Sequence, residues 1–171
     1  MIAGARARGA GDLDGDGYDD MVARSGGELA IYYGGSTGPS TRPDATVTPP
    51  MGADGFGHAV EPLGDVDGDG RGDLLVGAPD AADPLHRPQA GALYVLYGAA
   101  RGASHDVVVL DHGPRPDFRL GRHMACSDFN LDAILDCVDY DGYDPPTMSL
   151  YVGGPTRSLQ ISGRAAAAGA P

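Results

Sequence analysis

The sequence predicts an all-β protein, and three observations lead to that class. The apolar runs are four to six residues long, and none repeats at the i, i+3, i+4, i+7 spacing of an amphipathic helix. The 28 glycines and 14 prolines separate these runs, as residues of tight turns do. The chain also contains an internal repeat whose units have room for several short strands each.

An acidic segment occurs three times along the chain. The copies begin at Gly11 (GDLDGDGYDDMV), Gly64 (GDVDGDGRGDLLV) and Ser127 (SDFNLDAILDCV). Each is followed by an apolar run that leads into a glycine (ELAIYYGG, ALYVLYGA, MSLYVGG) and by a further β-like run (DATVTP, DVVVL, SLQIS). Weakly alternating stretches, FGHAVEPLG and LGRHMACS, precede the second and third copies and fit a first strand.

Each unit therefore contains four short antiparallel strands, with the acidic segment between the first strand and the second. Four such strands in 50 to 60 residues are the content of one β-propeller blade. We expect three blades at residues 1–53, 54–117 and 118–163, followed by a disordered tail at 164–171.

The acidic segments are candidate calcium loops. Counted from the first aspartate, each has side-chain oxygen ligands at positions 1, 3, 5 and 9, a turn residue at position 6 and a backbone carbonyl to offer at position 7. Such an oxygen-rich set suits a hard divalent cation. The predicted ligands are Asp12, Asp14, Asp16, Tyr18 and Asp20, then Asp65, Asp67, Asp69, Arg71 and Asp73, and finally Asp128, Asn130, Asp132, Ile134 and Asp136.

Two other interpretations of these segments remain open at this point. Asp and Gly are common in solvated turns, although three copies on a repeat favour a bound ion. An EF-hand needs a Glu at position 12 and a flanking helix, whereas position 12 is Ala23, Val76 or Asp139 here. Without a cation, the carboxylates of one loop would repel each other.

The net charge of −12 argues against a nucleic-acid partner or an anionic membrane surface, because both need clustered basic residues. No apolar run approaches 18 residues, so we expect no membrane insertion. The start, MIAGARARGAG, lacks the apolar segment of a signal peptide.

The middle unit resembles the FG-GAP repeat of integrin α-subunit β-propellers and of related bacterial secreted proteins. It contains Phe56-Gly57, the acidic loop, and then Gly77-Ala78-Pro79. The first unit lacks a visible Phe-Gly, and the third has Leu120-Gly121 in its place. The resemblance implies that each loop lies between the first two strands of a blade and binds calcium.

The resemblance also implies two departures from a complete module. In the third loop Asn130 replaces an aspartate and Ala133 replaces the turn glycine, so we expect two calcium sites and a weaker third one. Propellers of the family usually have seven blades. We therefore expect these three blades to be part of a larger propeller, or to be completed by association.

Cys126 and Cys137 flank the third loop. If that loop joins two antiparallel strands, the two cysteines can face each other and form a disulfide, which would imply an oxidising compartment. Two buried free thiols are the alternative.

Motifs for catalysis are not evident in the sequence. The five histidines show no tight metal-ligand spacing, and no serine has a Gly-x-Ser-x-Gly context. We expect a non-enzymatic, calcium-binding extracellular module for adhesion or for recognition of a protein or glycan. The alternative is an accessory or catalytic portion of a secreted carbohydrate- or lipid-active enzyme.

The tripeptide Arg71-Gly72-Asp73 has the sequence of a cell-adhesion ligand. Here Asp73 stands at position 9 of the loop and leads into a strand, so we interpret the tripeptide as a coincidence of the calcium pattern.

Overall fold

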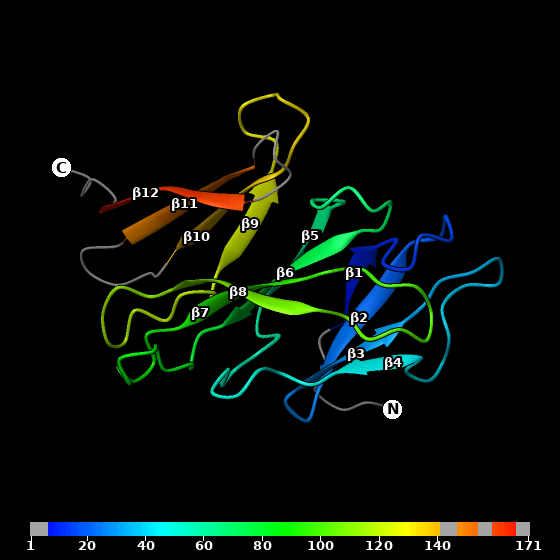
Figure 1. The fold of residues 1–171 in the computed structure, drawn as a ribbon, viewed down its shortest axis with the longest axis horizontal. Coiled ribbons are helices and arrows are strands. Elements are labelled where there is room, and N and C mark those ends of the chain that lie inside the picture. Colours follow the sequence, from blue (N-terminus) through cyan, green and yellow to red (C-terminus); the bar gives the residue numbers. More distant parts are fainter. Residues whose placement is uncertain (1–6, 141–146, 154–158, 167–171) are drawn as a thin grey trace.

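The computed structural model describes residues 7–140, 147–153 and 159–166. Within these ranges the chain forms twelve β-strands and no helix (Figure 1). The strands form three four-stranded sheets in which every neighbouring pair is antiparallel. The predicted all-β class, with four-stranded β-propeller blades, is therefore confirmed.

Each sheet consists of four consecutive strands. Sheet 1 contains β1 (Ala7–Gly11), β2 (Asp20–Ser25), β3 (Glu28–Tyr32) and β4 (Ala45–Val47). Sheet 2 contains β5 (Val60–Gly64), β6 (Asp73–Ala78), β7 (Ala92–Leu96) and β8 (Val107–His112). Sheet 3 contains β9 (Met124–Ser127), β10 (Asp136–Tyr140), β11 (Thr147–Gly153) and β12 (Leu159–Ala166).

The last strand differs from the predicted boundary. We expected the third unit to end at residue 163, but β12 continues to Ala166 and pairs with β11 along its length. The first three residues of the expected tail thus belong to a strand. The rest of that tail, 167–171, lies outside the described residues.

The first strand of each sheet lies next to the first strand of the next. Strand β5 contacts β1 on one side and β9 on the other (Figure 1). The three sheets are therefore arranged side by side around their first strands, and each acidic segment leaves a first strand on the same side of the molecule, toward the top of Figure 1.

The middle sheet is covered on both faces, which explains why its strands are apolar runs without alternation. All residues of β6 and β7 are buried. Leu74 and Val76 pack toward sheet 1, in a cluster where the rings of Phe56 and Tyr94 meet edge to face at 5.6 Å. Leu75 on the opposite face packs in the cluster shared with sheet 3.

The Phe-Gly and Leu-Gly dipeptides occupy equivalent places between sheets. Phe56 is 1% exposed between sheets 1 and 2, and Leu120 is 0% exposed between sheets 2 and 3. Gly121 has a positive φ of 85°, and a Cβ there would lie 2.6 Å from the Cα of Gly77. The glycine is therefore needed for close approach of the two backbones, while Leu can replace Phe as the apolar partner.

No helix that could cross a membrane occurs in the described part of the chain.

Candidate metal-binding loops

The three acidic segments form loops between the first and second strands of their sheets. We refer to residues 12–20 as loop 1, 65–73 as loop 2 and 128–136 as loop 3. The residue just before each loop is paired with the last residue of that loop: Gly11 with Asp20, Gly64 with Asp73, and Ser127 with Asp136. Pairing of the strands therefore closes each loop into a compact turn.

The aspartate at position 1 organises the turn. In loop 1, Oδ1 of Asp12 accepts hydrogen bonds from the amides of Gly15 (2.8 Å) and Asp16 (3.0 Å), and Oδ2 accepts one from Gly17 (2.8 Å). Asp65 accepts the corresponding three bonds in loop 2. Both loops thus have the same backbone conformation, set by the short Asp side chain and the glycines.

The aspartate at position 9 has a second role that the ligand pattern did not predict. Asp73 is 1% exposed, and its Oδ2 accepts a bond from the amide of Val66 at 2.8 Å. Its Oδ1 accepts one from the amide of Gly98, just beyond β7, at 2.9 Å. The carboxylate therefore joins the loop to the end of the third strand.

The same pair of bonds recurs in the other two loops. Asp20 accepts from Leu13 and Gly34, both at 2.7 Å, and Asp136 accepts from Phe129 at 3.2 Å and Gly153 at 3.0 Å. We call Asp20, Asp73 and Asp136 the closing aspartates. Burial raises the pKa of Asp20 above its usual value and that of Asp73 to about 6, because desolvation disfavours the charged form.

The glycines that bond to the closing aspartates were not identified as functional from the sequence. A Cβ at Gly34 would lie 2.3 Å from the carbonyl oxygen of Asp19, and one at Gly98 would lie 2.5 Å from that of Gly72. At Gly153 the carbonyl oxygen of Leu135 would be 2.6 Å away. The sequence signal that could have identified them is the glycine at the end of the third apolar run of every unit. A glycine is required there because the neighbouring backbone leaves no space for a side chain.

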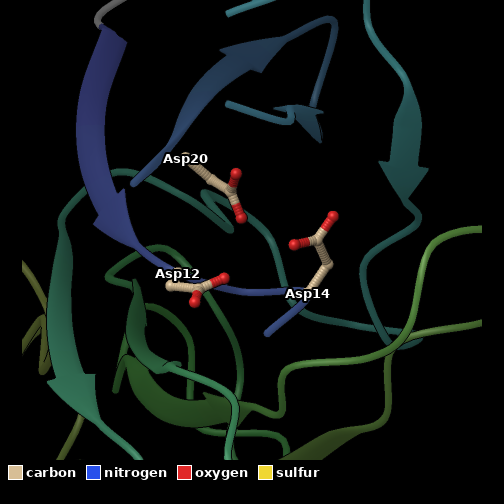
Figure 2. Close-up of side chains that lie close together, drawn as sticks. All are labelled: Asp12, Asp14 and Asp20. Atoms are coloured by element: carbon tan, nitrogen blue, oxygen red, sulfur yellow. The ribbon is translucent and has the colours of Figure 1, made fainter. Parts of the chain in front are cut away.

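Loops 1 and 2 bring carboxylates together as a metal site requires. Carboxylate oxygens of Asp12, Asp14 and Asp20 lie within 4.8 Å of one another and face one small space (Figure 2). Asp65, Asp67 and Asp73 form the same group in loop 2. Positions 1, 3 and 9 of both loops therefore provide clustered oxygen donors, which fit a hard divalent cation.

Positions 5 and 7 contribute differently. Asp16 and Asp69 are not in the clustered groups, and each has one oxygen bonded to the amide of position 7, at 2.9 Å from Tyr18 and from Arg71. The outer oxygen of each is paired with an arginine, Asp69 with Arg71 at 2.6 Å. That the backbone carbonyl of position 7 binds the ion stays a prediction.

Loop 3 has the same outline but poorer chemistry for a cation. The amide of Asn130 donates to Oδ2 of Asp132 at 3.1 Å, so one carboxylate oxygen is already engaged. Leu131 and Ala133 have φ values of 63° and 68°, at positions where loops 1 and 2 have glycines. Within the described ranges, the aspartates of loop 3 form no clustered group like those of loops 1 and 2.

Cys126 and Cys137 form a disulfide in this structure. They are directly opposed on β9 and β10, with Cα atoms 4.1 Å apart, so the bond joins the two strands that hold loop 3. The predicted bridge is thus present, rather than two free thiols, and it indicates an oxidising compartment.

The Arg-Gly-Asp tripeptide is held within the fold. The amide of Gly72 donates to the carbonyl of Asp12 in the neighbouring sheet at 2.6 Å, and Asp73 is the buried closing aspartate. The Arg71 side chain is 31% exposed and pairs with Asp69 of the same loop. Such a segment cannot present its carboxylate to another protein without unfolding the loop.

Position 2 of each loop shows how neighbouring sheets cover the loops. Leu13 is 0% exposed. Its carbonyl accepts a hydrogen bond at 2.9 Å from the amide of Ala99, which lies in the connection between β7 and β8 of sheet 2. Val66 is 7% exposed and packs in the cluster shared with sheet 3. Phe129, the equivalent residue of loop 3, is 55% exposed.

Comparisons with known proteins agree with this architecture. A family model described as an FG-GAP-like repeat matches residues 12–76, from the start of loop 1 into β6. Integrin alpha-PS3 of Drosophila melanogaster is 37% identical over an alignment of 81 residues, which covers 42% of this chain and 7% of the relative. Integrin alpha-PS5 of the same organism is 35% identical over 107 residues, covering 57% of this chain and 11% of the relative.

The second kind of similar protein has the name of an enzyme. Phosphatidylinositol-glycan-specific phospholipase D of Homo sapiens is 37% identical over an alignment of 79 residues, which covers 42% of this chain and 9% of the relative. The chain thus spans about a tenth or less of the length of these relatives. The similarity concerns the repeated blades rather than any whole protein.

Proposed function

Because the chain is an FG-GAP repeat protein, similar to integrin α-subunits and built from four-stranded β-propeller blades, we propose that it is a calcium-binding module of an extracellular protein. The observation that carries the proposal is the pair of identical carboxylate groups in loops 1 and 2. Three carboxylates held within 4.8 Å of one another repel unless a cation is bound. An oxygen-only donor set favours calcium over softer metals.

The ion would have a structural task. Asp12 and Asp14, with the closing aspartate Asp20, would hold it in loop 1, and Asp65, Asp67 and Asp73 would hold it in loop 2. When bound, the cation supplies the positive charge that offsets these carboxylates. The loop then keeps the closing aspartate in place, and through it the end of the third strand, so that adjacent blades remain packed.

Calorimetric titration with calcium tests the proposal and the ranking of the loops. We expect two tighter sites, in loops 1 and 2, and a third site in loop 3 that is at least about tenfold weaker than loop 2, because Asn130 removes a charge and Ala133 occupies a glycine conformation. Asp12→Ala and Asp65→Ala should each remove one of the tighter sites, while Asp128→Ala should remove only the weak one. Loss of the tightest site in Asp128→Ala would reverse the ranking.

We further propose that the module serves adhesion or recognition of a protein or glycan outside the cell. Its support is the likeness to integrin α-subunits and the disulfide, which fits an oxidising compartment. Free thiols in the purified protein would contradict the extracellular location. The second candidate, an accessory part of a lipid-active enzyme, is favoured by one observation, the likeness to phosphatidylinositol-glycan-specific phospholipase D.

The exposed residue Phe129 supports association with a further blade. Leu13 and Val66 are buried by the next sheet, whereas Phe129, Tyr140 (44% exposed) and Met148 (45% exposed) remain accessible on sheet 3. We expect the chain to self-associate at micromolar concentration and Phe129→Asp to weaken that association, as measured by sedimentation velocity in calcium. A monodisperse monomer at all concentrations would contradict the proposal.

A further inference from the structure

A cation from another sheet already lies at loop 1. Arg101, in the connection between β7 and β8 of sheet 2, pairs with Asp14 and with Oδ2 of Asp16, the latter at 2.6 Å. The same guanidinium donates to the carbonyl of Gly34 at 2.8 Å and lies 5.0 Å from the centre of the Tyr33 ring. Four groups of sheet 1 thus hold one arginine of sheet 2.

The contacts of Arg101 use the oxygens that the loop leaves available. Oδ1 of Asp14 accepts from the amide of Asp16, and Oδ1 of Asp16 accepts from the amide of Tyr18. Oδ2 of each is the oxygen bound by Arg101. A metal ion bound in loop 1 would therefore lie next to the positive charge of Arg101, which already contacts the predicted ligand Asp14. Either Arg101 leaves the Asp14 carboxylate, or the two cations share it.

The position of Arg101 is fixed by the packing of sheet 2 on sheet 1. Three residues before it, a Cβ at Gly98 would lie 2.8 Å from the carbonyl oxygen of Leu13, and the adjacent Ala99 donates to that same oxygen. Arg101 therefore reaches loop 1 only when sheet 2 is packed against sheet 1. Its side chain is half exposed, so it can move away when a stronger cation binds.

We propose that Arg101 is the internal cation of loop 1, which lowers the calcium affinity of that loop and ties sheet 2 to sheet 1 when calcium is absent. The inference rests on the proposed calcium function of the loop. Two cations that share one carboxylate group compete, so calcium binding and the Arg101 contact weaken each other. The reciprocity of linked equilibria requires that removing either strengthens the other.

The test isolates loop 1 in the full chain. Asp67→Asn and Asp132→Asn each remove one carboxylate charge from the other two loops and weaken their sites, and Arg101→Gln is then added to this background. Arg119→Gln is the matched control, because it removes the same charge but contacts Asp80 at 3.3 Å and Gln89 at 2.6 Å, neither of which belongs to an acidic loop. Calcium affinity is measured by calorimetric titration, and thermal unfolding is followed in chelator and in saturating calcium.

We expect Arg101→Gln to raise the calcium affinity of loop 1 at least about tenfold, since a unit charge next to the ion is removed. The control should leave the affinity within about twofold. Arg101→Gln should also lower the midpoint of thermal unfolding in chelator, and this loss should shrink or disappear in saturating calcium. Both results together support the inference.

Two outcomes would contradict the proposed role of Arg101, and they can be told apart. Calcium binding of equal or lower affinity in Arg101→Gln contradicts competition, while the calcium function of the loop stands. Absence of calcium binding with Arg101 present and with Arg101 replaced contradicts the proposed function itself, and the inference falls with it.

Discussion

Replacing Asp73 by alanine should lower the free energy of unfolding by about 3 to 6 kcal/mol, even when no metal is present. The carboxylate is buried and accepts two hydrogen bonds, from the amides of Val66 and Gly98. Hydrogen bonds to a charged group contribute about 1.5–3 kcal/mol each, and their loss leaves buried donors without a partner. The substitution also removes one of the three clustered carboxylates of loop 2.

The neighbouring residue provides a matched control. Arg71 pairs with Asp69 in a partly exposed contact, so Arg71→Ala should cost no more than about 1 kcal/mol. Its predicted contribution to metal binding is the backbone carbonyl, which alanine retains. The two substitutions within one tripeptide should therefore differ several-fold in effect.

Urea denaturation in chelator and in calcium separates the two roles of Asp73. Asp67→Asn removes a clustered carboxylate but no contact to the third strand, so it should destabilise the protein in calcium and have little effect in chelator. Asp73→Ala should destabilise in both conditions. If its effect vanishes in chelator, the closing bonds to Val66 and Gly98 contribute little, and Asp73 acts only as a ligand.

Removal of calcium should lower the midpoint of thermal unfolding by about 10–20 °C. Each site filled at a hundred times its dissociation constant adds about 2.7 kcal/mol to the folded state. Two such sites, in loops 1 and 2, add about twice that, and a chain of this size shifts by about 2–4 °C per kcal/mol. The expected loss follows from the clustered carboxylates of Asp12, Asp14 and Asp20 and their counterparts.

Thermal unfolding followed by circular dichroism, with calcium and then with excess chelator, measures this shift. A protein in which Asp14 and Asp67 are both replaced by asparagine is the control, because it should unfold at nearly the same temperature in both conditions. Magnesium in place of calcium shows whether the loops select the larger ion. An unchanged midpoint in the parent protein would contradict a structural metal in these loops.

The repeat made much of the blade architecture predictable from the sequence. Runs such as ALYVLYGA and DVVVL correspond to β7 and β8, and the glycines between runs mark turns as expected. Strand ends were less predictable, since β12 continues past the predicted boundary to Ala166. The end of β12 depends on how far it can pair with its neighbour β11. The local sequence of β12 does not contain that information.

The acidic loops were predictable because much of their conformation is local. Asp65 accepts hydrogen bonds from amides three to five residues ahead of it, and glycines supply the required φ angles. Ala133 was expected to sit unfavourably in loop 3, and its φ of 68° confirms this. Leu131 shares the same strain, which the ligand pattern alone did not indicate.

What the sequence by itself determined is thus the class, the repeat and the shape of each loop, since these depend on residues within a few positions of one another. Only the tertiary structure decided what surrounds each loop. Asp73 meets Gly98 across 25 residues, and Arg101 meets Asp14 across 87. Such contacts exist because whole sheets pack together and bring distant residues into hydrogen-bonding range. The same packing buries Leu13 and leaves Phe129 exposed at equivalent positions of the repeat.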